Sequence, residues 1–361
     1  MAGLSSAEAP RGTAMILRLA IIGYGNVGRE FARMLTRKRE WLIKNKGLDI
    51  EVLAISTRSK GSLLSDKALD LGKVEDELER NGHLRGYGRE SSDLSPLEII
   101  DNCGADVMVE LTTLDIRDGQ PAIDHISNAL QSKMHVITAN KGPIAFAYDK
   151  LESLARSRNV KLRFEGTVMD GTPIFNLVEK TLQGCEITRL EGILNSTSNY
   201  VLTEMSKGRT LDDAVKETRK LGILEADPSH DLDGWDAAAK ITALANVLMG
   251  AGSTPLKVKR SGLSDLSPDD IVSARSEGTK IKFVARAERD GTNVQTSVVP
   301  ERLRSDSPFW SVDGTSGALT ISTDLMGELT IFETDPVQTV TAYAVFSDLL
   351  LIADWIRCSS L

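Results

Sequence analysis

The feature that most constrains the fold is a glycine pattern at the end of the first apolar stretch. The chain there reads LRLAIIGYGNVGREFARML, which is an apolar strand, G-x-G-x-x-G and then a helix of period 3.6. In this context Gly23 permits the tight turn, Gly25 lets a pyrophosphate approach the backbone, and Gly28 lets helix and strand pack closely. The free amides at the helix start, at Asn26 and Val27, can face the phosphates. The pattern predicts dinucleotide binding, and the alternative is a tight strand–helix turn without a ligand.

Apolar strands and helices alternate through the first half of the chain. Four further apolar stretches follow the first strand, namely Ile50–Thr57, Asp106–Thr113, His135–Thr138 and Val160–Phe164. Segments of helical periodicity separate them, and this βαβ alternation predicts a parallel sheet of the doubly wound Rossmann type. Residues 61–95 are charged and weakly periodic. We expect an excursion there that carries one or two short helices.

The end of the second strand bears on the choice of dinucleotide. Sites that prefer NAD usually place an acid there to hold the ribose 2′-hydroxyl. This strand ends instead in Arg58, Ser59 and Lys60, and two cations with a hydroxyl suit a 2′-phosphate. NADP is therefore expected to be favoured over NAD, with a solvated basic loop as the alternative. Thr112 and Thr113 end the third strand, at the sheet edge where such folds bind ligands.

The second half of the chain predicts a different arrangement, an α+β domain. Apolar alternation at Glu186–Leu194, Lys280–Glu288, Asn293–Val299 and Leu319–Ile331 indicates a mixed or antiparallel sheet. Helices are expected over Tyr200–Lys207 and Leu211–Leu221. A long, largely apolar helix at Val337–Ile356 should pack back on the first domain. The chain thus divides into a disordered lead (1–14), a dinucleotide-binding domain (15–160) completed by the helix 337–361, and a second domain (161–336).

The most acidic stretch of the second half reads GILEADPSHDLDGWDAAAK. Pro228 and Gly234 predict that its first part is not helical, and a helix begins near Trp235. Asp236 and Lys240 are four residues apart, so they share one helical face. The alternative is a solvated loop with a surface ion pair worth roughly 0.3 kcal/mol. Because the helix continues as an apolar run that must be largely buried, a lysine on its first turn indicates a functional site.

Composition limits the classes of partner. The formal net charge is −8, which argues against nucleic acid, since phosphate binding needs a clustered basic surface. No apolar run approaches the roughly 20 residues that a membrane-spanning helix needs, so no membrane partner is expected. Cys103, Cys185 and Cys358 are few, scattered and odd in number, as in proteins of a reducing cytoplasm.

Together these motifs resemble the homoserine dehydrogenase family. The acidic stretch matches every fixed position of the family signature, which is G-x-x-E-x-D-P-x-x-D, an aliphatic residue, and x-G-x-D-x-x-x-K. The segments GYGNVG, HVITANKGPIA, EGTVMDGTPI and GILNSTSNYVL add matches in the expected order. The resemblance covers nearly the whole chain, from about Leu17 to Ile356. No aspartate kinase or regulatory domain is expected, as in the short monofunctional form.

The resemblance implies an NAD(P)-dependent oxidoreductase that interconverts L-homoserine and L-aspartate 4-semialdehyde. The family acts in threonine, methionine and isoleucine biosynthesis, and its members are typically dimers that meet through a strand-rich region. This makes 161–336 the catalytic and dimerisation domain. Lys240 matches the family's acid/base at the substrate hydroxyl, and Asp236 would bind that hydroxyl or hold Lys240. Lys141 matches a lysine at the junction of cofactor and substrate, where it can polarise the carbonyl.

The family's substrate and cation residues also have counterparts. Glu225 resembles the residue that takes the substrate's ammonium, with Asp231 in support, and Thr197 and the backbone at Ser196 match the substrate loop. A monovalent cation, sodium or potassium, is held in the family largely by backbone carbonyls, and the matching residues are Glu165, Val168, Asp170 and Thr172.

The chain departs from the family pattern at three places. Ser196 replaces a usual glycine in the substrate loop, and Met169-Asp170 replaces a smaller, apolar pair in the cation loop. Phe332–Pro336 stands where the family often has a glycine-rich segment that contacts the cofactor. Two alternative functions stay open on the residues alone. One is another amino-acid or semialdehyde dehydrogenase of the same plan, such as a diaminopimelate or aspartate dehydrogenase, and the other is a catalytically silent NADP-binding sensor.

Overall fold

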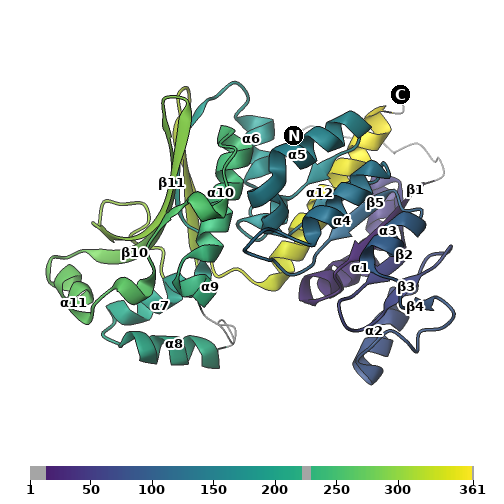
Figure 1. The fold of residues 1–361 in the computed structure, drawn as a ribbon, viewed down its shortest axis with the longest axis horizontal. Helices are drawn as coiled ribbons and strands as arrows, with labels where there is room; N and C mark the ends of the chain where they lie inside the picture. The colour runs from purple at the N-terminus through teal and green to yellow at the C-terminus, as the bar shows by residue number, and fades with distance from the viewer. Residues whose placement is uncertain (1–13, 222–228, 360–361) are drawn as a thin grey trace, which may run out of the picture.

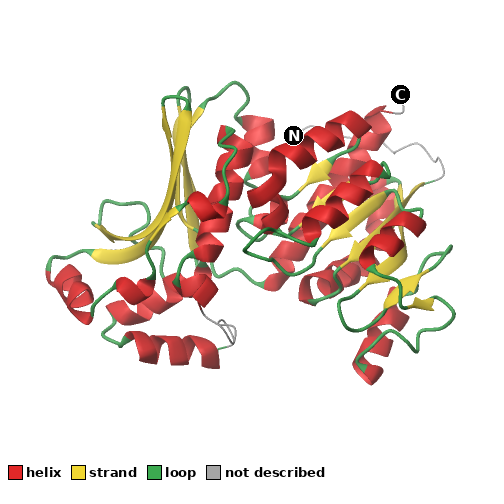
Figure 2. Cartoon of the chain, viewed as in Figure 1, coloured by secondary structure: helices red, strands yellow, loops and turns green. Residues whose placement is uncertain are grey.

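The computed structural model describes residues 14–221 and 229–359, which form two sheets with helices packed around and between them (Figures 1 and 2). The expected lead, 1–14, therefore lies almost entirely outside the described residues. The first sheet has the strand order β4-β3-β2-β1-β5-β6-β7. Its five parallel strands are β1 (Met15–Ile22), β2 (Leu48–Ser56), β5 (Val107–Glu110), β6 (His135–Thr138) and β7 (Leu162–Arg163).

Alternation along β1 shows how this sheet is covered. Leu19 and Ile21 point to one face, where they join the core formed with α1 (Asn26–Lys46) and α12 (Gln338–Ser359). Ala20 and Ile22 point to the other face, which α3 (Pro96–Asn102), α4 (Ala122–Gln131) and α5 (Lys141–Arg158) cover. Helices on both faces make the sheet doubly wound, as the sequence predicted.

The prediction for residues 61–95 is wrong in one respect. The segment carries one helix, α2 (Leu71–Asn81), within the expected number. It also carries two strands that were not expected, β3 (Ser62–Leu64) and β4 (Ser91–Ser92), which add to the sheet edge in antiparallel pairing. Strands of three and two residues are too short to show a periodicity of two.

The second sheet is mixed, with the order β13-β12-β8-β10-β11-β9. Among the described strands of this sheet, β9 pairs in parallel with β11, and the other pairings are antiparallel. Its strands are β8 (Ile187–Ile193), β9 (Lys259–Arg260), β10 (Lys280–Asp290), β11 (Asn293–Leu303), β12 (Gly317–Thr323) and β13 (Gly327–Glu333). The single stretch expected at Leu319–Ile331 is a hairpin of β12 and β13, because its apolar alternation continues across the turn.

Some helices of the second domain lie between this sheet and the first domain, and the others gather at one end of the sheet (Figure 1). The helices are α6 (Phe175–Thr181), α7 (Ser196–Ser206), α8 (Leu211–Lys220), α9 (Ser229–Leu232), α10 (Trp235–Met249) and α11 (Pro268–Ser276). Two differ from the expectation. Helix α7 starts at Ser196 and not at Tyr200, because the Asn195 side chain accepts from the Ser198 amide and caps it. Helix α9 lies in the stretch expected to be non-helical, because proline does not prevent a helix from starting after it.

Helix α10 is the central element of the second domain. It begins after Gly234, whose φ of 76° is the left-handed conformation. A Cβ at Gly234 would also lie 2.7 Å from Phe283, so only glycine fits this start. Most of the following residues, from Ala237 to Asn246, are buried against the sheet and α5. The first turn of α10 is thereby held at the junction with the first domain.

Helix α12 returns the chain to the first sheet, where it packs beside α1 (Figure 1). Within the described residues it is the one helix long and apolar enough to cross a bilayer, with a mean hydropathy of 1.4 over Thr339–Ser359. Its inner positions, including Ala342, Val345 and Leu349, are however fully buried in the core of the first domain. Such burial is typical of a helix in the core of a folded domain. The expected boundary between 160 and 161 stays a prediction.

Candidate active site

The glycine turn after β1 has the conformation that its pattern predicts. Gly23 has a φ of 100°, and a Cβ there would lie 2.5 Å from the Leu111 backbone. A Cβ at Gly28 would lie 2.6 Å from the Gly23 carbonyl oxygen, so this glycine allows α1 to approach the turn. Among the described residues, no atom lies within 4 Å of the Cβ position at Gly25, and no side chain caps α1, which starts at Asn26 and Val27. The open space and uncapped amides suit a phosphate ligand.

The loop after β2 presents its cations to solvent. Thr57 closes the loop, because its hydroxyl accepts from the Lys60 amide at 2.8 Å and donates to the Gly61 carbonyl at 2.7 Å. Arg58 and Lys60 are exposed, and neither forms an ion pair with another described residue. Their charges are available to a ligand at the carboxyl end of β2.

The two threonines after β5 differ in their surroundings. Thr112 donates to the buried carboxylate of Glu110, and its carbonyl oxygen accepts from the Asn140 side chain at 3.1 Å. Thr113 is exposed. Asn140 also caps α5 by accepting from the Gly142 amide. Thr112 therefore helps to fix the start of α5, where Lys141 lies.

Two lysines from different helices meet on one carboxylate. The Lys141 ammonium at the start of α5 lies 2.9 Å from Asp236 Oδ1, and the Lys240 ammonium on α10 lies 3.2 Å from Asp236 Oδ2. Lys240 also donates to the Leu194 carbonyl at 2.7 Å. All three side chains are at most one-fifth exposed. The sequence predicted the Asp236–Lys240 pair, and the structure adds Lys141 to it.

Burial and neighbouring charges shift the pKa values of this cluster in opposite directions. Burial alone raises the pKa of Asp236, but the charges of Lys141 and Lys240 outweigh it and hold this pKa well below its usual value. Burial alone lowers the pKa of Lys240, but Asp236, with more distant Asp170 and Glu333, outweighs it and raises the pKa. Lys240 is therefore an ammonium ion before substrate binds.

Asn195 is the residue of this site that sequence reasoning missed. Its side-chain amide donates to Asp231 at 2.8 Å and to Asp236 at 2.9 Å, so it joins the two carboxylates. Thr197 is a further hydrogen-bond partner of Asp231. Burial, and then the charge of Asp236, raises the pKa of Asp231. Asn195 stood in the polar run Asn195–Tyr200 that the sequence offered as a helix cap or ligand site, and it serves as a cap while contacting both acids.

Helix α7, which starts at Ser196 and Thr197, is held in place by the hydrogen bonds of Asn199. Fully buried Asn199 donates to the carbonyls of Val312, Gly314 and Ser316 at 3.0, 3.1 and 3.1 Å. Its oxygen accepts from Lys282, which is 2% exposed. The substrate residue expected at Glu225 lies outside the described residues.

The expected cation loop is shaped by its own side chains. The Glu165 carboxylate accepts from the amides of residues 174–176 at 2.6–2.9 Å and so caps α6. Asp170 has a φ of 43° and accepts from Thr341, while Thr172 donates to Glu333 at 3.0 Å. The carbonyl oxygens of Val168, Asp170 and Thr172 accept no hydrogen bond from any described residue. Free backbone oxygens fit the hard oxygen donors that sodium and potassium take.

Comparison with known proteins identifies the family. The model of the homoserine dehydrogenase NAD-binding domain matches residues 23–165, and the homoserine dehydrogenase model matches residues 173–350. The chain belongs to the homoserine dehydrogenase family. The resemblance that the motifs indicated is thus confirmed, and the first domain is an NAD(P)-binding domain.

Relatives and solved structures agree with this assignment. A homoserine dehydrogenase of Methanocaldococcus jannaschii is 37% identical over 92% of this chain and 98% of its own length. An NAD(+)-dependent homoserine dehydrogenase of Pseudomonas canavaninivorans is 34% identical over 93% and 96%. A hyperthermophilic archaeal homoserine dehydrogenase in complex with NADPH is 33% identical, covers 93% and 97%, and superposes with a TM-score of 0.80. The two-domain fold is that of homoserine dehydrogenases.

The segment Phe332–Pro336 is one of the places where the chain departs from the family pattern. Within Phe332–Pro336, Glu333 accepts from Thr172 of the expected cation loop. Asp335 has a φ of 41° and accepts from Thr315 at 2.9 Å. This segment is therefore tied to the second domain by acidic side chains, where the homoserine dehydrogenase family often has glycines. Burial and the charge of Asp170 raise the pKa of Glu333.

Proposed function

We propose that this protein interconverts L-homoserine and L-aspartate 4-semialdehyde with a nicotinamide cofactor, in threonine, methionine and isoleucine biosynthesis. The observation that carries the proposal is the Lys141–Asp236–Lys240 cluster. It lies where α5 leaves the carboxyl end of β6, the sheet edge that also carries the glycine turn. A nicotinamide held at this edge would supply or accept the hydride at the carbon that bears the oxygen.

Lys240 is assigned the proton transfer at the substrate oxygen. When the aldehyde is reduced, the Lys240 ammonium donates a proton as charge develops on that oxygen. When the alcohol is oxidised, Lys240 must first lose its proton. Since Asp236 raises the pKa of Lys240, oxidation should need alkaline pH, while reduction starts from the protonation state that the free protein already has.

The other residues bind and orient. Lys141 can polarise the carbonyl from the cofactor side, and Asp236 holds both ammonium groups in place. Asp231 and Thr197, with the backbone at Ser196 and the side chain of Glu225, are assigned to the amino-acid end of the substrate. A monovalent cation would be held by the carbonyls of the loop 165–172, where it would fix the loop beside the junction of the domains.

NADP is the proposed preferred cofactor, held in the Gly23–Gly28 turn with contacts from Thr112 and Thr113. The exposed cations Arg58 and Lys60, with no described ion-pair partner, support a 2′-phosphate contact. The solved relative with NADPH supports it as well, while the Pseudomonas relative is named for NAD(+). The proposed assembly is a cytoplasmic homodimer through the second sheet, without nucleic-acid or membrane partners.

Turnover with both cofactors tests the proposal. Purified protein with L-homoserine and either NADP or NAD should produce the absorbance of reduced nicotinamide at alkaline pH. Diaminopimelate and L-aspartate are the control substrates, because they distinguish the alternative dehydrogenases. If L-homoserine yields no reduced nicotinamide, or if a control substrate yields it faster, the proposed substrate is rejected.

A further inference from the structure

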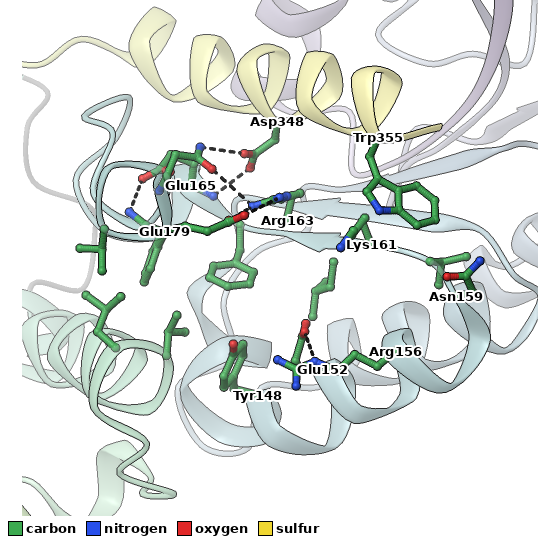
Figure 3. A pocket seen from close by; sticks show the side chains of 18 residues that line it. Tyr148, Glu152, Arg156, Asn159, Lys161, Arg163, Glu165, Glu179, Asp348 and Trp355 are labelled. Carbon is green, nitrogen blue, oxygen red and sulfur yellow. Dashed lines mark hydrogen bonds and ion pairs between the residues drawn. The ribbon is translucent and has the colours of Figure 1, made fainter. Parts of the chain in front are cut away.

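A cavity lined by described residues lies apart from the proposed active site. It has a volume of about 700 Å³ and lies beside β7, between α5, α6, the end of α10 and α12 (Figure 3). Both domains thus contribute walls to it. A cavity of this size can hold a small organic molecule. Its chemistry can be read from which polar groups are already satisfied.

The carboxylates at the cavity walls already have donors. Glu152 accepts from Arg156 at 2.7 Å, and Glu179 accepts from Arg163 and Lys180. Glu165 accepts from three backbone amides of α6. Asp348 accepts from the Glu165 amide at 2.9 Å and from Asn176. The acceptor capacity of the walls is therefore largely used within the protein.

Several donors at the walls lack such partners, among them the buried Nε of Arg163, the Lys161 ammonium and the Tyr148 hydroxyl. Lys161 forms no ion pair with any described residue, and its ammonium lies 5.2 Å from the centre of the Trp355 ring. The Tyr148 hydroxyl forms no hydrogen bond among residues 14–221 and 229–359. Burial raises the pKa of Tyr148 to about 12, so this hydroxyl keeps its proton and can donate. Figure 3 shows Lys161 on the strand side and Tyr148 on α5, both beside the cavity.

The remaining walls are aromatic and aliphatic. The ring of Phe164 lies between those of Tyr148 and Phe175, with edge-to-face contacts at 5.7 and 4.9 Å. Val247 and Leu248, near the end of α10, also line the cavity. These groups can bury an apolar body, for which area is the main source of affinity.

From this combination we infer that the cavity binds a small organic anion, in which an apolar or aromatic body carries one carboxylate or sulfonate. The body lies against Phe164, Phe175 and Val247, and the anionic group accepts from Lys161, while the Tyr148 hydroxyl is a further donor on the opposite wall. The site is separate from the Lys141–Asp236–Lys240 cluster, so its occupancy does not depend on the proposed reaction.

Fluorescence titration tests this site directly. The probe is 1-anilinonaphthalene-8-sulfonate, an aromatic anion whose emission rises in apolar surroundings, titrated into wild-type protein with saturating NADP to fill the nucleotide site. One saturable site per chain is expected. 3-Phenylpropanoate should displace the probe, while neutral 3-phenylpropan-1-ol of the same shape should do so at least tenfold less well, since one charge-assisted contact is worth about tenfold or more.

Variants locate the probe in the cavity. Lys161→Met should weaken the probe about tenfold or more, whereas Lys150→Met, an exposed lysine on α5 outside the cavity, should leave its affinity unchanged. Val247→Trp should abolish binding by filling the space, with unchanged circular dichroism showing that the protein is folded. Equal affinity of wild type and Lys161→Met, or equal displacement by the acid and the alcohol, would overturn the anion site. Binding that survives Val247→Trp would place the probe elsewhere.

Discussion

Lys141 and Asp236 lie 95 positions apart in the chain, and their side chains meet in an ion pair of 2.9 Å between helices α5 and α10. The contact joins the helix that follows β6 of the nucleotide sheet to the helix that carries Lys240. Both side chains are at most one-fifth exposed. The proposed catalytic cluster is therefore assembled only when the two domains are packed together.

Replacing Lys240 by methionine should remove proton transfer and keep cofactor binding. The turnover number should fall by about 10²–10⁴-fold, the usual contribution of a positioned acid/base. The NADP dissociation constant should stay within twofold, because the glycine turn is on another domain. Steady-state rates and nicotinamide fluorescence measure the two quantities. Lys150→Met is the surface control. Near-normal turnover of Lys240→Met would contradict the assignment of proton transfer to Lys240.

Asp236→Asn should shift the pH dependence of L-homoserine oxidation. The negative charge of Asp236 raises the pKa of Lys240 against burial. Without that charge the buried ammonium is disfavoured, so the pKa falls and the acid limb of kcat/KM against pH moves to lower pH by about one unit or more. The maximum rate should fall as well, because Lys141 loses its partner. A limb that stays in place or moves to higher pH would contradict the role of Asp236.

Arg58→Ala should change cofactor preference. Loss of a charge-assisted contact with a 2′-phosphate should raise KM for NADP about tenfold or more. KM for NAD, which lacks that phosphate, should change less than twofold. Initial rates with each cofactor at saturating L-homoserine give both values, with exposed Lys38→Ala on α1 as the control. Parallel loss with NADP and NAD would reject the phosphate contact.

Asn199→Ala should destabilise the protein. The substitution removes three donated bonds to the 312–316 segment and leaves their carbonyls, with buried Lys282, short of partners. The expected loss is about 2–4 kcal/mol of the free energy of unfolding. Urea denaturation measures it, and Asn45→Ala, which removes one exposed bond to Trp41, should cost about 0.5 kcal/mol or less. Similar losses for both variants would show that the Asn199 network adds little.

His135 should make stability fall in mild acid. Burial lowers its pKa from 6.5 to about 4, and its Nδ1 accepts from the Lys161 amide at 3.0 Å. Because the folded pKa lies below the unfolded value, this stability is complete above pH 6.5 and is lost as pH falls toward 4, by up to about 3 kcal/mol. His135→Asn should reduce the difference in the free energy of unfolding between pH 7.5 and pH 5, as measured by urea denaturation. His83→Gln, at an exposed histidine, should leave the slope unchanged.

Local rules explain what the sequence could predict. The glycines at 23, 25 and 28 act on neighbouring backbone, and the Asp236–Lys240 spacing follows from one helical turn. The contact of Lys141 with Asp236 depends on how α5 packs on α10, and no local pattern encodes it. Asn195 was visible as a polar residue before a helix, but its bonds to Asp231 and Asp236 arise from three separate elements.

The return of α12 to the first sheet has a consequence for biosynthesis of the chain itself. The buried side chains of α12, among them Val345, Leu349 and Ile352, fill one face of the nucleotide-binding core. They leave the ribosome after the entire second domain. Until then the part of this apolar face that α1 does not cover stays open to chaperones and proteases. A nascent chain therefore cannot complete the core of its first domain before its catalytic helix α10 has been made.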